Sequence, residues 1–179
     1  MGRAPTLTDH FFRTTYRGAY RLMRAYWALR HPKTHGALVA LWHEGKLLLV
    51  KNSYAPYYSL PGGYVRAGET SRQAAVRELR EELGVVAKPE ALGLAVDQHH
   101  EWEGKQEHIE IYELEWGEPA DIVVDNREVV SAQYMAPERA LRLTLFPPIR
   151  DLIERRLTGA LAIRPGAPAR DAKGPQEHR

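Results

Sequence analysis

Three glutamates stand close together in the chain, and their spacing is the feature most able to do chemistry. Glu78, Glu81 and Glu82 lie at positions i, i+3 and i+4, so a helix would place their carboxylates on one face. Like charges at this spacing cost a helix about a few tenths of a kcal/mol per pair, and Arg77 and Arg80 offset only part of that cost. The pattern indicates either a solvated charged face or a face that binds cations.

The loop before these glutamates favours the second interpretation. Leu60-Pro61-Gly62-Gly63 leads into a turn at Gly68 and Glu69. Such a loop can bring backbone carbonyls and the Glu69 carboxylate close to the glutamate face. Oxygen ligands without thiols or imidazoles are typical of Mg²⁺ and Mn²⁺ sites. The sequence therefore predicts a site for Mg²⁺, with Mn²⁺ as a second ion it could take.

Local signals predict the helix that carries the glutamates. Thr70 and Gln73 form a capping box at its start, and Gly84 suits the left-handed residue that follows its end. A buried stripe is expected on the face away from the acids, formed by Ala75, Val76, Leu79 and Leu83.

Residues 63–85 resemble the signature of the Nudix hydrolases: Gly, five residues, Glu, seven residues, then Arg-Glu-aliphatic-any-Glu-Glu-any-Gly-aliphatic. Every specified position is filled, by Gly63, Glu69, Arg77, Glu78, Leu79, Glu81, Glu82, Gly84 and Val85. The order of strands, loop and helix around it extends the resemblance over roughly 36–157. The resemblance implies a Nudix-type α/β/α sandwich with a mixed sheet, and an enzyme.

The resemblance also implies a reaction and roles for the signature residues. Nudix hydrolases cleave a nucleoside diphosphate linked to a group X, such as a nucleotide sugar or ADP-ribose, by water attack on a phosphorus. Glu78, Glu81, Glu82 and the Gly63 carbonyl would hold divalent ions. Arg77 would orient the glutamates. Structural or supporting roles would fall to Glu69, Gly68 and Gly84.

Two carboxylates could remove the proton from the attacking water. Glu78 lies within the signature, whereas Glu128 lies where many relatives place a glutamate before a late strand. Glu78 is slightly favoured, and both stay open. For substrate binding the candidates are Tyr54, Tyr57 and Tyr58, which could stack on a base or sugar, although the position of Tyr58 beside the Gly-Gly loop favours a packing role. The histidines at positions 99, 100 and 108 are more typical of a surface or a substrate edge than of metal ligands.

Apolar periodicity predicts the remaining elements. Strands are expected at 36–43 and 46–52, joined by a turn at Glu44-Gly45, and at about 91–100, 107–116 and 127–136. A final helix is expected at 146–157. Residues 9–30 predict an extra N-terminal amphipathic helix with an apolar stripe formed by Phe12, Tyr16, Tyr20, Met23 and Trp27. That stripe suggests a homodimer in which the helix helps to bury the contact.

These signals divide the chain into a helical extension (1–34), a Nudix domain (35–160) and a disordered tail (161–179). The 179 residues include no cysteine and carry a formal net charge of +2, and no apolar run reaches the length of a membrane span. We expect a cytoplasmic enzyme that acts on a small nucleotide, with neither DNA nor a membrane as partner. The alternatives are an RNA 5′-end pyrophosphohydrolase, whose phosphate contacts the basic N-terminal helix would supply, and a non-catalytic nucleotide-sensing module.

Overall fold

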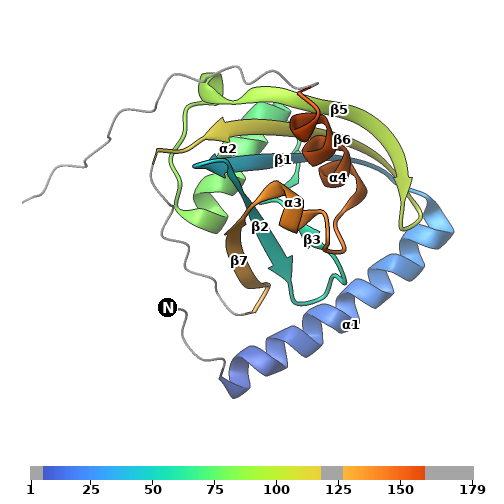
Figure 1. Ribbon diagram of the computed structural model, residues 1–179. Coiled ribbons are helices and arrows are strands. Elements are labelled where there is room, and N and C mark those ends of the chain that lie inside the picture. The colour runs from blue at the N-terminus through green and yellow to red at the C-terminus, as the bar shows by residue number, and fades with distance from the viewer. Residues whose placement is uncertain (1–5, 118–126, 160–179) are drawn as a thin grey trace, which may run out of the picture.

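The computed structural model describes residues 6–117 and 127–159, which are built around one mixed β-sheet (Figure 1). Its strands are β1 (Lys33–His43), β2 (Lys46–Asn52), β3 (Tyr58–Ser59), β4 (Gly62–Tyr64), β5 (Gly93–Trp102), β6 (Lys105–Glu115) and β7 (Val129–Met135). Strand β1 pairs in parallel with β6, and β6 pairs antiparallel with β5. Along its other edge, β1 pairs first with β4 and then with β2, which also binds β3 and β7.

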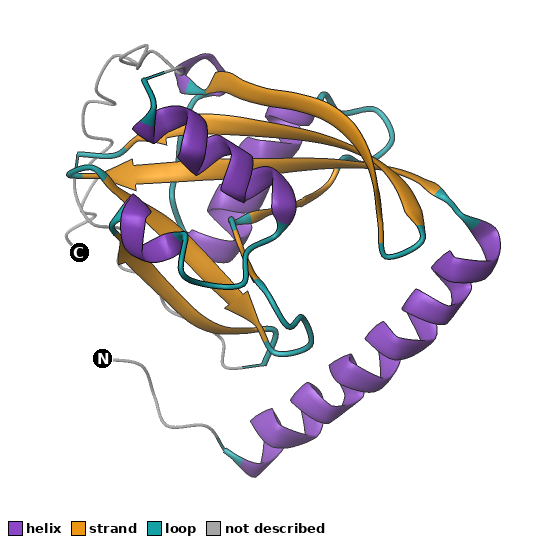
Figure 2. Ribbon diagram, turned by 45° about the vertical axis from the view of Figure 1, so that its right-hand side comes forward, coloured by secondary structure: helices purple, strands orange, loops and turns teal. Residues whose placement is uncertain are grey.

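Helices cover both faces of this sheet (Figure 2). The described helices are α1 (Leu7–Arg30), α2 (Ser71–Leu83), α3 (Pro137–Ala140) and α4 (Pro147–Leu157), with a 3₁₀ turn η1 (Pro89–Ala91), and α2 and α4 are the two that lie on opposite faces. One core lies between the sheet and α4, and the other lies between the sheet and α2. Strand β1 contributes alternate residues to the two cores. Because both of its faces are buried, its sequence is a nearly continuous apolar run. The predicted α/β/α sandwich with a mixed sheet is confirmed.

The predicted local signals are found in the structure. The Thr70 hydroxyl accepts from the Gln73 N–H, the Gln73 side chain caps the Thr70 N–H, and Gly84 has a φ of 67°. Glu44 and Gly45 both have positive φ, at 48° and 72°, as a tight hairpin with the twist of its strands requires. Four short elements were not predicted, namely β3, β4, α3 and η1. The predicted tail at 161–179 lies outside the described residues.

Helix α1 lies along one edge of the domain, between the tip of the β5–β6 hairpin and the end near β7 (Figures 1 and 2). Four members of its predicted apolar stripe, all except the exposed Met23, are half-buried, and each contacts a residue of the same chain outside α1. The idea that this stripe covers a partner is therefore wrong. A different face of α1 remains exposed, with Leu7, Phe11, Leu22, Tyr26 and Leu29. No helix among the described residues is both long and apolar enough to cross a bilayer.

Candidate active site

Helix α2 turns its acidic face toward the short strand β4. The apolar face of α2 is buried on the sheet through Ala75, Leu79 and Leu83, which orients Glu78 toward Gly63. A Cβ atom on Gly63 would lie 2.7 Å from Glu78 Oε1. The absence of a side chain at Gly63 therefore lets the β4 backbone and the Glu78 carboxylate approach each other.

Arg77 joins three of the carboxylates. Its guanidinium forms a two-point contact with Glu69, through Nη2 to Oε1 at 2.7 Å and through Nε to Oε2 at 3.1 Å. Its Nη1 contacts Glu78 and also donates to Glu81 Oε2 at 3.2 Å. The hydrogen bonds from Arg77 and from the Arg66 N–H lower the pKa of Glu69 to about 2. Glu69 therefore stays charged and fixes the position of Arg77 beneath the acidic face.

Glu82 differs from its neighbours in exposure and in charge. Its Oε2 accepts a hydrogen bond from the Gly62 N–H at 2.9 Å, and the side chain is half-buried, whereas Glu81 is exposed. Burial, followed by the charges of Glu78, Glu128 and Glu81, raises the pKa of Glu82 to about 7, against the opposing effect of the Gly62 hydrogen bond. The acidic face is thus not uniformly solvated.

These groups fit a divalent cation bound through oxygen. The donors are carboxylates that lie beside the β4 backbone, and their mutual repulsion contributes to the raised pKa of Glu82. A cation would relieve that repulsion and hold the deprotonated form. Arg77 Nη1 contacts both Glu78 and Glu81, whereas Glu82 is bound by the Gly62 N–H. Among the described residues, the oxygens of these three glutamates do not converge on one point.

The structure brings Glu128 to the same region, although it lies 46 positions after Glu82 in the sequence. Its backbone oxygen accepts from the Ser53 N–H at 2.8 Å, and its side chain accepts from the Tyr54 hydroxyl at 3.1 Å. Its charge is one of those that raise the pKa of Glu82. Burial, followed by the Glu128 charge, raises the pKa of Tyr54, so this hydroxyl remains a donor.

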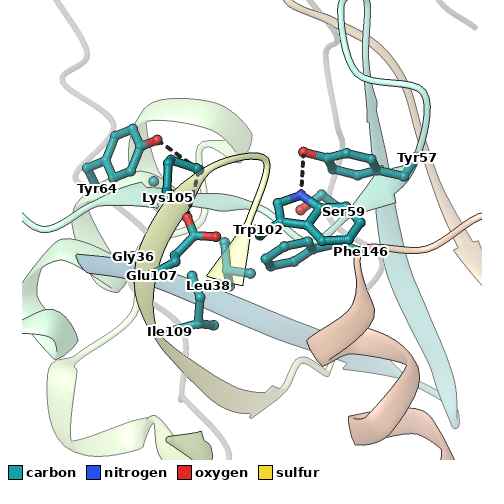
Figure 3. A pocket seen from close by; sticks show the side chains of 11 residues that line it. Gly36, Leu38, Tyr57, Ser59, Tyr64, Trp102, Lys105, Glu107, Ile109 and Phe146 are labelled. Atoms are coloured by element: carbon teal, nitrogen blue, oxygen red, sulfur yellow. Dashed lines mark hydrogen bonds and ion pairs between the residues drawn. The ribbon is translucent and has the colours of Figure 1, made fainter. Parts of the chain in front are cut away.

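A cavity lined in part by Gly63 adjoins the acidic face, because Gly63 also lies against Glu78. Figure 3 shows ten of its lining residues with labels. Its volume is about 130 Å³, below the roughly 300 Å³ at the lower end for pockets that hold a whole drug-sized ligand. We call it the aromatic pocket, and it is lined by Gly36, Leu38, Tyr57, Ser59, Gly63, Tyr64, Trp102, Lys105, Glu107, Ile109 and Phe146. The pocket suits one planar part of a substrate whose charged part lies outside.

Of the three predicted substrate tyrosines, only Tyr57 lines this pocket. Its ring lies 5.7 Å from that of Trp102 and 5.9 Å from that of Phe146. Tyr54 instead bonds to Glu128. Tyr58 packs against the core beside α4 and lies under the Lys51 ammonium, 5.2 Å from its ring centre, so the structure does not bring it to the pocket.

The three predicted histidines separate onto the two faces of the sheet. His99 stacks on His108, which stacks on His35 in turn, with ring centres 4.2 and 4.3 Å apart. Among the described residues, His35, His108 and Glu110 form a group with metal-ligand spacing. The imidazoles of His35 and His108 each have a carboxylate 2.7 Å away, from Glu110 and Asp97 respectively. These contacts account for the grouping without a metal.

His100 lies on the other face, 5.5 Å from the Phe146 ring. It is one of several functional candidates that sequence reasoning missed or undervalued, the others being Trp102, Lys105, Glu107 and Phe146. One signal was available in the strand pattern. On β6, Lys105 and Glu107 have the same parity as Ile109 and Ile111, which face the α4 core. A lysine and a glutamate on an apolar face predict a buried polar site.

The fold and the acidic face define a member of a known enzyme family. The NUDIX domain family model matches residues 32–156. A Bacillus subtilis (strain 168) protein, named provisionally as an 8-oxo-dGTP diphosphatase, is 34% identical over 115 residues, or 64% of this chain and 73% of the relative. An ADP-ribose pyrophosphatase of Methanocaldococcus jannaschii is 42% identical over 52 residues, or 27% of this chain and 31% of the relative.

A solved structure agrees with these sequence relatives. The crystal structure of a MutT NUDIX hydrolase from Burkholderia pseudomallei matches with a TM-score of 0.60 and 25% identity, over 68% of this chain and 96% of that one. The chain belongs to the Nudix family and is a Nudix hydrolase. Nudix hydrolases generally need divalent metal ions. The family match begins at residue 32, so α1 lies outside it.

Proposed function

We propose that this protein is a divalent-metal-dependent pyrophosphohydrolase that cleaves a nucleoside diphosphate linked to another group. The observation that carries the proposal is the adjacency of two features at Gly63. On one side lie the carboxylates of Glu78, Glu81 and Glu82, and on the other lies the aromatic pocket. A nucleotide has the same division into a planar apolar base and a charged phosphate chain.

Each residue of the acidic face has a part in the proposed reaction. Glu78, Glu81, Glu82 and the Gly63 carbonyl would hold Mg²⁺ or Mn²⁺. The bound ion would neutralise pyrophosphate charge and lower the pKa of the attacking water. Arg77, fixed by Glu69, holds Glu78 and Glu81 in position. Gly68 shapes the turn before α2 with a φ of 86°, and Gly84 ends the helix.

We assign proton removal from the attacking water to Glu78, with Glu128 as the alternative. Glu78 lies against Gly63, where the acidic face and the pocket meet. Glu128 is exposed and is held by Tyr54, so it also has a defined position near Glu82. Replacing each by Gln separates them, because loss of the base removes the rise of kcat with pH, whereas loss of a metal ligand raises the metal concentration needed.

A second candidate function is pyrophosphate removal from an RNA 5′ end. A separate hollow favours it, lined by three arginines of α1 together with Tyr20, Tyr54 and Pro56. Arg17 donates to the Ser53 carbonyl oxygen at 3.0 Å, and Arg24 pairs with Glu103 at 3.5 Å. Because Tyr54 also contacts Glu128, phosphates of a longer chain could follow these arginines away from the acidic face.

We also propose that residues 1–34 are an extension to a Nudix domain at 35–160, and that two copies associate through α1. The exposed α1 residues Leu7, Phe11, Leu22 and Leu29 support this association, since they form an apolar face on a helix whose other side is already packed. Light scattering at micromolar concentration is the test. A dimer that becomes monomeric in Leu22→Glu supports the proposal, and a wild-type monomer contradicts it.

The experiment that tests the proposed activity is a substrate panel. Nucleoside triphosphates, ADP-ribose, nucleotide sugars, dinucleoside polyphosphates and 5′-triphosphorylated RNA are incubated with the protein and Mg²⁺ or Mn²⁺, and the products are resolved to locate the broken bond. We expect hydrolysis of a small nucleotide that stops with EDTA and returns with Mg²⁺ or Mn²⁺. Full activity after exhaustive chelation contradicts the proposed metal site.

A further inference from the structure

The aromatic pocket contains a buried carboxylate that is only half paired. Glu107 is 5% exposed, and its Oε1 accepts from the Lys105 ammonium at 2.9 Å. Its Oε2 is also buried and has no hydrogen-bond partner among the described residues. His100 Nε2 lies 3.6 Å from that oxygen, which is too far for a hydrogen bond. A buried acceptor of this kind is costly unless something supplies a donor.

The surroundings of Glu107 indicate what that donor belongs to. The rings of Tyr57, Trp102 and Phe146 form one wall, and Glu107 and Lys105 lie opposite them (Figure 3). Flat aromatic walls suit a planar heterocycle. The edge of Glu107 and Lys105 offers one acceptor oxygen beside an ammonium donor, which matches a heterocycle with an N–H group next to a carbonyl oxygen or a ring nitrogen.

The His100 side chain leaves Glu107 available to such a ligand. Both of its ring nitrogens are buried without a hydrogen-bond partner among the described residues. Burial lowers the pKa of His100, against the raising effect of Glu107. Burial, the largest single effect, would also lower the pKa of Lys105, but the charges of Glu107 and Tyr64 and the hydrogen bonds to them together outweigh it, so the pKa is raised. The side of the pocket opposite the aromatic rings therefore consists of the charged pair Lys105 and Glu107, with the neutral imidazole of His100 behind it.

We propose that the aromatic pocket binds the base of the nucleotide substrate, and that Glu107 Oε2 accepts a hydrogen bond from an N–H on the edge of that base. This inference rests on the proposed function, because it names the part of the substrate that enters the pocket. It assigns selectivity to Glu107 and leaves the chemical step to the acidic face. Substrates whose base offers no N–H leave the buried oxygen without a donor and are rejected.

Helix α1, which lies outside the family match, positions two sides of this pocket. The Trp27 ring lies over Lys105, with its centre 4.4 Å from Nζ. The Tyr20 hydroxyl lies 3.4 Å from that of Tyr57 and also bonds to Glu103 in the hairpin turn that leads to Lys105. We therefore include Trp27 and Tyr20 in the proposal as positioning residues, which act through Lys105 and Tyr57.

The first experiment varies the base at constant ribose and triphosphate. Hydrolysis of ATP, GTP, CTP and UTP is compared with that of purine riboside triphosphate, whose base has no N–H, and of ribose 5-triphosphate, which has no base. We expect kcat/KM for at least one N–H-bearing base to exceed that for purine riboside triphosphate by about tenfold or more. In Glu107→Gln this ratio should fall toward one, chiefly through KM, with ribose 5-triphosphate hydrolysed as in the wild type.

Two outcomes overturn the proposal. One is a wild type that does not distinguish bases with an N–H from purine riboside. The other is a Glu107→Gln variant that slows all substrates equally, since that shows a purely structural pair with Lys105. If no compound is hydrolysed, the proposed function fails. Calorimetric binding of the corresponding 5′-monophosphates then still tests whether the pocket binds a base through Glu107. Tighter binding of N–H-bearing bases, lost in Glu107→Gln, supports it, and equal binding contradicts it.

The second experiment tests α1. Trp27→Leu should raise KM for base-bearing nucleotides about threefold to tenfold and leave ribose 5-triphosphate hydrolysis unchanged, whereas Trp27→Phe should retain the wild-type KM because a ring still covers Lys105. Tyr26→Leu is the matched control, as it removes an exposed aromatic from the next position of the same helix. Equal changes in Trp27→Leu and Tyr26→Leu, or an effect on ribose 5-triphosphate as well, would refute the positioning role.

Discussion

The acidic face and the aromatic pocket meet at Gly63 but are assembled in opposite ways. The acidic face comes almost entirely from one continuous stretch, residues 63–85, in which a loop, a turn and a helix follow one another. The pocket is gathered from β1, the β3 region, β4, the β5–β6 hairpin and the start of α4, and α1 supports it from outside the family match. The contrast indicates that the proposed chemical step depends on a local sequence motif, whereas the proposed selectivity for the base depends on packing between distant parts of the chain.

The largest expected effect on activity comes from removing the charge of one proposed metal ligand. Glu81→Gln and Glu82→Gln should each lower kcat by about a hundredfold or more, because each deletes a carboxylate from the proposed cation site. Steady-state kinetics at saturating Mg²⁺ measures the loss, with Glu138→Gln on α3 as an exposed control. Binding of nucleoside monophosphates in the pocket should persist. Near-normal turnover in either variant would refute the assignment of the chemical step to the acidic face.

The two neighbouring glycines of β4 offer a sharper comparison. Gly62 has a φ of 142°, and a Cβ there would collide with the Ala37 carbonyl oxygen, so Gly62→Ala should lower the free energy of unfolding by about 2–3 kcal/mol. Gly63 has no such backbone conflict, but its Cβ would meet the Glu78 carboxylate. Gly63→Ala should therefore lower kcat about tenfold with a smaller loss of stability. Urea titration and kinetics separate the two, and the reverse ranking would refute this assignment.

A pH dependence follows from the raised pKa of Glu82, which is about 7 in the folded protein. The folded state binds this proton more tightly than the unfolded state, whose pKa is about 4.3. Glu82 protonation therefore stabilises the metal-free protein fully below that unfolded value, and the contribution is lost as pH rises through 7. Mg²⁺ affinity should change in the opposite sense and increase through pH 7.

Thermal unfolding of the metal-free protein and Mg²⁺ titration at pH 5, 6, 7 and 8 test this dependence. Glu82→Gln should flatten the stability profile between pH 5 and 8. A wild-type profile that the substitution leaves unchanged would show that another group titrates there.

The smallest expected effect concerns Tyr54. Tyr54→Phe removes the hydroxyl that donates to Glu128 and should lower kcat about twofold to fivefold, because Glu128 loses one of its positioning contacts. A loss as large as that of Glu128→Gln would show that the hydroxyl itself takes part in the reaction. Tyr58→Phe is the control, since Tyr58 packs away from the pocket.

The sequence predicted what is local and missed what is assembled. The caps at Thr70 and Gly84, the hairpin turn at Glu44-Gly45 and the long strands depend on residues within a few positions of each other, and the structure has them. The short strands β3 and β4 form only because β2 and β1 lie beside them. No local signal could predict these pairings.

The side-chain contacts in the pocket could not be predicted from the sequence for the same reason. Phe146 and Trp102 are far apart in sequence, and only the packing of α4 on the sheet brings their rings to 5.7 Å. The aromatic stripe of α1 was predicted correctly as a stripe. Its partner could not be predicted, because helical periodicity shows which face is apolar but not what covers it.

The contact between Gly104 and Ala28 couples the pocket to the local stability of α1. A Cβ on Gly104 would lie 2.9 Å from the Ala28 backbone, so the hairpin turn and the helix are in direct contact. A peripheral helix whose aromatic contact side chains are only half-buried opens at lower free energy than the core, and its amide protons should exchange with solvent first. The β5–β6 turn would lose its support in the same openings. The apparent dissociation constant for substrate then equals the intrinsic value divided by the fraction of molecules in which α1 is docked.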